Sequence, residues 1–374
     1  MRRISSSMAV CVMVGVAGLG FSARAHETDQ YTLPLDKPFA DVGDLLDASH
    51  YRIVARAVER ANREIERALR EPESASMRKR LATLRSQEYL VEAVYSQMND
   101  AMSDISGVES ALRGKWAKEA YPGQYTEYST LDWIYTYSHA WLDPRRLITV
   151  WRSSTIKAYG VYFGSDKMSH FHHMGHFYYT AWRENLGKGM SESDAVANVI
   201  VRYSGGGPLG ETGLLGFAAT GVYSNADLCS NYMGFKFFRN ITEPMVLKGE
   251  ERPPMVVRTG PFWRLNVHVR PESGWFGAFV SDHWNEAMNP NLYDVTIRAD
   301  VKSLIERRSE SIMKFWTQRD GRPADAAYYE KLAGELSTYF GENYGHSSPD
   351  TPLMTLGNTV IPAMLARRSS GAKP

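Results

Sequence analysis

Apolar residues recur at helical spacing over much of this 374-residue chain, and this restricts it to a mainly α-helical fold. Residues 44–70 and 76–112 carry the two longest patterns, and Pro72 separates them. Two antiparallel helices that pack through their apolar faces are predicted, so residues 26–115 are expected to form a long N-terminal helical hairpin. The charged residues on the outer faces indicate solvent exposure.

The rest of the chain predicts a multi-helix domain at residues 116–344, followed by a flexible tail at 345–374. Further helical patterns cover residues 166–186, 191–203, 225–240, 300–316 and 325–344. The glycines and β-forming residues of ETGLLGFAATGVYS, residues 211–224, predict a loop and a small β-hairpin. The expected fold is therefore mainly α with this small β insertion.

The N-terminus has the pattern of an exported precursor. A basic pair at residues 2–3 precedes an uncharged apolar stretch at residues 8–21, and A-R-A at residues 23–25 supplies small residues for cleavage. The apolar stretch is shorter than the ~20 residues that a membrane-spanning helix needs. Residues 1–25 are therefore predicted to be a signal peptide. The mature chain would begin at His26, in the periplasm or outside the cell, with no transmembrane segment.

The composition restricts how the mature chain can be stabilised and which partners it is expected to bind. Cleavage would leave Cys229 as the one cysteine, so an internal disulfide is excluded and stability must come from a packed core. Hydrophobic residues make up 43% of the chain, which is enough for such a core. The formal charge of +1 offers no electrostatic reason to expect nucleic acid as a partner.

A histidine-rich helix is the first candidate site. In DKMSHFHHMGH, residues 166–176, Asp166, His170 and His173 follow one another at i, i+4 and i+7 and would share a helix face. Such a face could bind zinc, as a low-ranked cofactor in a chain otherwise expected to need none. The glutamate that a zinc-protease helix requires is replaced by His173. The structural alternative is a hydrogen bond between Asp166 and His170 that fixes the helix in an aromatic core.

Glu211 is the second candidate, because it is an isolated acidic residue among glycines and apolar residues. Burial there would raise its pKa and keep it protonated, as a general acid requires. Alternatively, its carboxylate accepts backbone hydrogen bonds and caps the loop.

Three polar residues that follow Glu211 in the sequence favour a catalytic role for this region. Tyr223 would lie across the predicted hairpin, and Asp227 with Asn231 would share a face of the next helix and bind substrate. Asp227 could equally complement the helix dipole. In a third segment, residues 281–290, Glu286 is a rival carboxylate, although a structural turn is the preferred interpretation there.

The order of helix, glycine-rich loop with Glu211, small hairpin and helix over residues 205–231 resembles the heart of the lysozyme and lytic-transglycosylase superfamily. It is most similar to divergent exported bacterial lysozymes that act on deacetylated peptidoglycan. The resemblance implies that Glu211 is the acid and Tyr223 a tyrosine of the sugar cleft. The aromatic-rich segment 121–162 would then stack on sugar rings.

The sequence therefore predicts an exported glycan hydrolase that cleaves peptidoglycan with Glu211 as general acid. One carboxylate does not distinguish hydrolysis from intramolecular transfer. Two alternatives stay open. One is a metal-binding periplasmic hydrolase that uses Asp166, His170 and His173. The other is a non-catalytic envelope protein that binds a partner through its helical hairpin.

Overall fold

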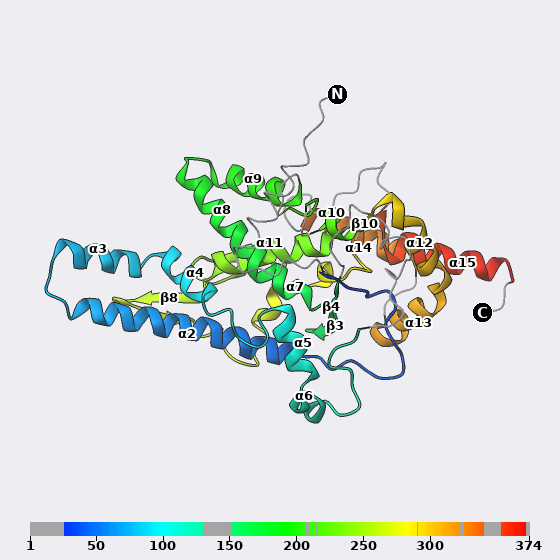
Figure 1. Ribbon diagram of the computed structural model, residues 1–374, viewed down its shortest axis with the longest axis horizontal. Helices are drawn as coiled ribbons and strands as arrows, with labels where there is room; N and C mark the ends of the chain where they lie inside the picture. The colour runs from blue at the N-terminus through cyan, green and yellow to red at the C-terminus, as the bar shows by residue number, and fades with distance from the viewer. Residues whose placement is uncertain are drawn as a thin grey trace, which may run out of the picture.

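A computed structural model describes residues 26–129, 151–205, 210–213, 216–289, 291–321, 325–339 and 353–371. Within this part the fold is mainly α with a few short strands, as the sequence predicts (Figure 1). The predicted signal peptide lies outside the described residues, and so do residues 130–150 of the aromatic-rich segment. Every helix in the described part is too short or too polar to cross a membrane.

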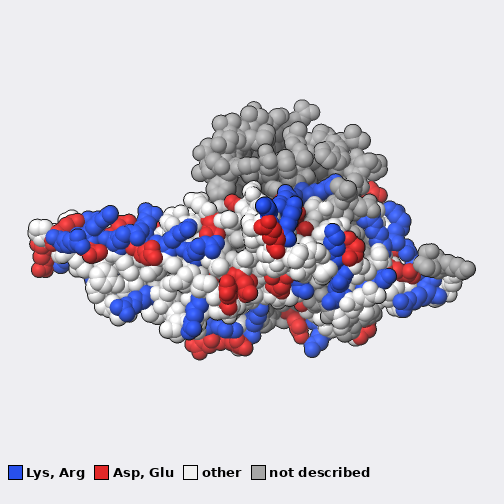
Figure 2. Space-filling view, turned by 90° about the horizontal axis from the view of Figure 1, so that it is seen from below, with Lys and Arg blue, Asp and Glu red and all other residues white. Residues whose placement is uncertain are grey.

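The N-terminal arm begins with one long helix, α2 (Gly43–Leu69; Figure 1). Its apolar stripe faces the core. Buried residues recur along it at helical spacing: Leu46, Ile53, Val54, Ala57, Ala61 and Ile65. The outer face carries i,i+4 ion pairs such as Arg70–Glu66 at 2.5 Å, and Figure 2 shows both signs of charge interleaved along the arm. This face is solvated, as its charge pattern predicts.

The return arm consists of several helices, so the single helix predicted over residues 76–112 is wrong. The segments are α3 (Ala75–Leu84), α4 (Gln87–Tyr95) and α5 (Ile105–Arg113), followed by α6 (Lys115–Ala120). The side chains of Ser86 and Asp104 accept hydrogen bonds from the third backbone N–H of α4 and α5. These two side chains therefore start new helices inside a pattern that reads as continuous.

Helix α11 (Asn225–Asn240) forms the centre of the molecule and matches its predicted bounds (Figure 1). Fourteen of its sixteen residues are buried, as expected of a helix that is enclosed on all sides. Helix α8 (Gly175–Gly187) crosses it where two glycines meet: a Cβ on Gly175 would lie 2.6 Å from the backbone of Gly234. Only glycine permits this close approach.

The predicted helix over residues 166–186 is observed, but it contains an irregular turn. Helix α7 (Asp166–Ser169) continues into a π-helical turn, His170–Met174, and then into α8. The next helix, α9 (Glu192–Ser204), begins and ends within one residue of its predicted bounds, 191–203. Its cap Ser191 accepts a hydrogen bond from the Asp194 N–H at 3.2 Å.

The strands form small separate sheets of two or three strands. Three are hairpins: β3 (Thr155–Ala158) with β4 (Val161–Gly164), β6 (Met245–Leu247) with β7 (Glu250–Arg252), and β8 (Val256–Thr259) with β9 (Phe262–Leu265). A parallel pair joins β1 (His26–Glu27) to β2 (Trp151–Arg152), and one sheet has the order β11–β10–β5.

The β-hairpin predicted within residues 211–224 is not formed. Residues Phe217–Thr220 make a helical turn, α10, which Gly221 ends in the left-handed conformation at φ 78°. Strand β5 (Val222–Tyr223) then pairs with the distant strand β10 (Asn291–Tyr293). The prediction is wrong because strand pairing here is decided by a segment far along the chain, which local sequence does not indicate.

The C-terminal part packs as a second core. It contains α12 (Val295–Arg307), α13 (Ser309–Asp320), α14 (Ala326–Tyr339), β11 (Leu353–Met354), the π-helical turn Leu356–Val360 and α15 (Ile361–Ser369). One helix had been predicted over residues 300–316, whereas α12 and α13 divide near Arg308. The prediction of a flexible tail at 345–374 is wrong over residues 353–371, which form regular structure. Met354, Leu356 and Ile361 are buried there and anchor the segment.

The N-terminal arm does not have a core of its own. One continuous cluster of buried apolar side chains runs from Ala40 through α2 and α11 to Trp284. The predicted boundary near residue 115 is therefore not a boundary of the core. The arm helix α2 and the central helices depend on the same packing.

Candidate functional site

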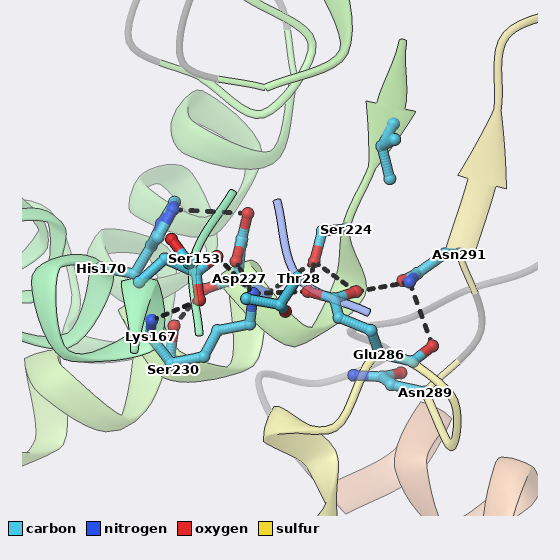
Figure 3. A network of polar contacts seen from close by, with 12 residues as sticks. Thr28, Ser153, Lys167, His170, Ser224, Asp227, Ser230, Glu286, Asn289 and Asn291 are labelled. Carbon is cyan, nitrogen blue, oxygen red and sulfur yellow. Dashed lines mark hydrogen bonds and ion pairs between the residues drawn. The ribbon is translucent and has the colours of Figure 1, made fainter. Parts of the chain in front are cut away.

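A lysine side chain is fully buried at the centre of the molecule. Lys167 Nζ lies 3.0 Å from Asp166 Oδ2 and 2.5 Å from Asp227 Oδ1, and it also contacts the Glu286 carboxylate (Figure 3). These four buried side chains are called the Lys167 cluster below. A charged group so far from water needs partners of this kind, because desolvation of an unpaired ammonium is very costly.

Three distant segments assemble the cluster. Lys167 lies in the first turn of α7, directly after the β3–β4 hairpin, and Asp227 lies in the first turn of α11. The cap of α11 is Ser224, whose Oγ accepts a hydrogen bond from the Asp227 N–H at 3.0 Å. The same Oγ donates to Glu286 at 2.8 Å, and Asn291 Nδ2 donates to Glu286 at 2.5 Å. The cap of the central helix thus links the backbone of Asp227 to the Glu286 carboxylate.

Lys167 and Glu286 each act on the pKa of the other in the direction of the charged form. Burial acts to lower the pKa of the Lys167 ammonium, but the carboxylates of Asp166, Asp227 and Glu286 outweigh burial and raise that pKa well above its ordinary value. Burial raises the pKa of Glu286 although Lys167 acts to lower it. Lys167 therefore remains charged and serves as the cation of the site.

Two further buried carboxyl groups, Glu27 and Glu211, feel the charge of this cluster. Burial is the main cause that raises the pKa of each well above its ordinary value, and the charge on Asp227 raises both further. The Ser224 N–H donates to Glu211 Oε1 at 2.8 Å and acts in the opposite direction on Glu211. The net effect favours the protonated acid at both positions.

Glu211 lies in the loop that follows α9, and its side chain is only 4% exposed. Its N–H donates to the Tyr203 carbonyl at 2.8 Å, and its own carbonyl accepts from the Phe217 N–H at 2.7 Å. A Cβ on Gly216 would lie 2.9 Å from the Glu211 carboxyl carbon, so the loop needs glycine there. Glu211 thus combines the two predicted properties, a hydrogen bond from the loop backbone and a raised pKa.

Tyr223 is brought close enough to Glu211 to feel its charge, although no hairpin joins them. Burial is the larger cause that raises the pKa of the Tyr223 phenol, and the Glu211 charge adds to it. Tyr223 is half-buried on β5, in register with Leu292 of β10. The Tyr223 phenol also hydrogen-bonds with Ser204, which acts to lower its pKa.

Asp227 and Asn231 do share a face of α11, and this face is turned toward Lys167 and His170. His170 Nε2 lies 3.3 Å from Asp227 Oδ2, and the Asn231 amide lies 3.1 Å from His170 Nδ1 (Figure 3 draws the His170–Asp227 pair). With the amide nitrogen of Asn231 directed at His170, it donates to Nδ1 and to the backbone carbonyls of His170 and Asp227. His170 then carries its proton on Nε2, facing Asp227.

The histidine-rich helix does not bring its predicted metal ligands together. Each imidazole has a partner of its own: His170 contacts Asp227, His172 contacts His50, His173 contacts Tyr95, and His176 contacts Glu92. The predicted bond between Asp166 and His170 is replaced by the contact of Asp166 with Lys167. Residues 170–174 form a π-helical turn, so the α-helical spacing that would align His170 with His173 fails there. Asp166 instead pairs with the ammonium of the adjacent Lys167.

Among the described residues, the one group of carboxylates and imidazoles close enough to share a metal ion is Asp166, Asp227 and Glu286. Lys167 Nζ contacts all three of these carboxylates and so occupies the position of a cation. The residues present therefore do not fit a metal ion, and the zinc predicted at Asp166, His170 and His173 has no support in their geometry.

Sequence reasoning ranked Glu286 too low and did not include Lys167, Glu27 or Ser224. One signal was available for Lys167, because a lysine beside Asp166 at the start of a largely apolar helix would be buried and would require partners. No sequence signal connects Glu27 or Glu286 to that lysine, since their segments meet it only through the tertiary fold.

No protein-family model matches the chain, and no curated protein and no solved structure is significantly similar to it. The chemistry of the site must therefore be argued from its own geometry.

Proposed function

We propose that this chain is an exported glycan hydrolase that cleaves peptidoglycan with Glu211 as its general acid. The observation that carries the proposal is the state of the Glu211 carboxyl. Burial and the charge of Asp227 raise its pKa well above the ordinary value of a glutamate. Two carboxyl groups whose surroundings separate their roles, one neutral and one ion-paired, are the arrangement that acid catalysis of glycoside cleavage uses.

In this mechanism Glu211 donates its proton to the glycosidic oxygen as the C–O bond breaks. The leaving sugar departs as an alcohol, and the other sugar becomes an oxocarbenium-like centre. Asp227, ion-paired to Lys167 at 2.5 Å, provides negative charge in the same region. Water completes a hydrolysis by adding to that centre and releasing a proton, which restores the acid; attack by a hydroxyl of the sugar itself completes a transfer.

The direct test is release of soluble fragments from purified peptidoglycan, both native and chemically deacetylated. Turnover should fall as pH rises through the raised pKa of Glu211, because an acid catalyst must be protonated. The descending limb should therefore lie well above pH 4.5, the ordinary glutamate value. A protein that solubilises neither substrate would remove the proposal.

Tyr223→Phe should reduce turnover less than any change at Glu211, because the phenol would orient or stabilise rather than donate the reacting proton. We expect a loss of about tenfold, the scale of one hydrogen bond. Tyr89→Phe is the matched control, since the Tyr89 hydroxyl hydrogen-bonds Glu64 in the N-terminal arm, outside the site. Equal rates for the Tyr223 and Tyr89 variants would exclude Tyr223 from the mechanism.

A further inference from the structure

Two fully buried imidazoles face each other between the arm and the histidine-rich helix. His50 on α2 and His172 in the π-helical turn place their Nε2 atoms 2.9 Å apart, which is a hydrogen-bond distance. The ring centroids are 5.0 Å apart. This contact belongs neither to Glu211 nor to the Lys167 cluster.

The other nitrogen of each ring is already committed to a backbone carbonyl. His50 Nδ1 lies 2.7 Å from the Leu46 oxygen, and His172 Nδ1 contacts the Ser103 oxygen. A carbonyl oxygen only accepts, so each Nδ1 must carry a hydrogen. Two neutral rings would then direct two bare lone pairs at each other across the Nε2–Nε2 contact. All four nitrogens are satisfied together only when the pair holds three protons.

We infer that His50 and His172 form a buried site for one shared proton, Nε2–H···Nε2, that locks α2 to the π-helical turn. The pair then carries a single positive charge, delocalised over two rings. Because the same turn presents His170 to Asp227, the pair acts as a positioning element for the Lys167 cluster. This inference does not depend on the proposed catalytic function.

The surroundings suit one positive charge. Phe276 stacks on His50 with ring centroids 3.6 Å apart, a geometry in which the aromatic face attracts an imidazolium. Phe171 and Phe237 pack against the same ring at steep angles, with ring centroids 6.4 and 6.2 Å away. The nearest charged groups oppose one another: the Asp100 carboxylate favours a charge on His50, and Arg52, which binds Asp100, disfavours it.

The same surroundings exclude a second charge. Burial lowers the pKa of His50 to about 4, and burial together with the neighbouring His50 ring lowers that of His172 well below its ordinary value, with a smaller contribution from His173. Burial therefore opposes the shared proton as well as a second one. What would hold the shared proton is the geometry, two Nδ1–H groups on carbonyl oxygens and the 2.9 Å Nε2–Nε2 contact.

The experiment is nitrogen NMR of the full chain labelled with ¹⁵N-histidine, at pH 7. We expect protonated-type Nδ1 shifts for both rings, intermediate Nε2 shifts, and one strongly low-field proton. His50→Gln and His172→Gln should each abolish that resonance. His176→Gln is the matched control, because His176 lies four residues after His172 and binds the exposed Glu92 of α4. This variant should leave the resonance unchanged.

Two outcomes would overturn the inference. One is a ring with an unprotonated Nδ1. This would mean that the pair is neutral and that one ring has lost its hydrogen bond to a backbone carbonyl. The other is a metal ion between the rings, detected as added mass in the native protein.

Discussion

Glu211→Gln should leave the fold intact and reduce peptidoglycan turnover by about 10², the usual scale of a general acid. The amide is nearly isosteric with the carboxyl group, and its oxygen can still accept the Ser224 N–H that now reaches Glu211 Oε1 at 2.8 Å. What the variant lacks is a proton that it can transfer. Fragment release and thermal unfolding, measured on the same preparation, separate the two effects.

Asp47→Asn is the matched control for this variant. Asp47 is another buried carboxylate, and it accepts a hydrogen bond from the Phe276 N–H at 3.0 Å and one from the Tyr159 hydroxyl at 2.8 Å. It lies outside the Lys167 cluster, so its amide should cost stability while the folded protein keeps its turnover. If Glu211→Gln behaves like Asp47→Asn, Glu211 only caps its loop.

Lys167→Met should be the most destabilising single substitution in the site, at about 3–5 kcal/mol. Methionine keeps much of the length of the side chain but removes the ammonium that Asp166, Asp227 and Glu286 share. Their charges would then be buried beside one another with no cation. Urea unfolding of wild type and variant measures the loss.

Two companions make the lysine experiment specific. Lys115→Met removes an exposed lysine that is paired with Glu119 at 3.6 Å, and it should change stability little. Adding Asp227→Asn to Lys167→Met should recover part of the loss, because it removes one of the unpaired charges. The deficit should also shrink as pH falls, since carboxyl groups without Lys167 have raised pKa values and bind protons in the folded state. A Lys167→Met variant as stable as wild type would show that the ammonium is dispensable.

Much of the local structure follows from the sequence alone. The periodic apolar residues of α2 and α11 determine where those helices lie, because an amphipathic or wholly buried helix is specified by its own residues. Ser191 likewise determines the start of α9 through a bond within one turn. The candidate acid Glu211 could be identified from its isolation among glycines and apolar residues, which already implies burial.

The tertiary structure alone decided which charges meet. Lys167 is 60 residues from Asp227, and Glu286 is farther still, so no spacing rule relates them. The π-helical turn at His170–Met174 redirected the histidines, and strand β10 took the place of the predicted hairpin partner of β5. Helical periodicity depends on residues that are close together in the sequence, so it can be recognised there. Contacts between buried charges arise where packing of distant segments leaves them no other partner.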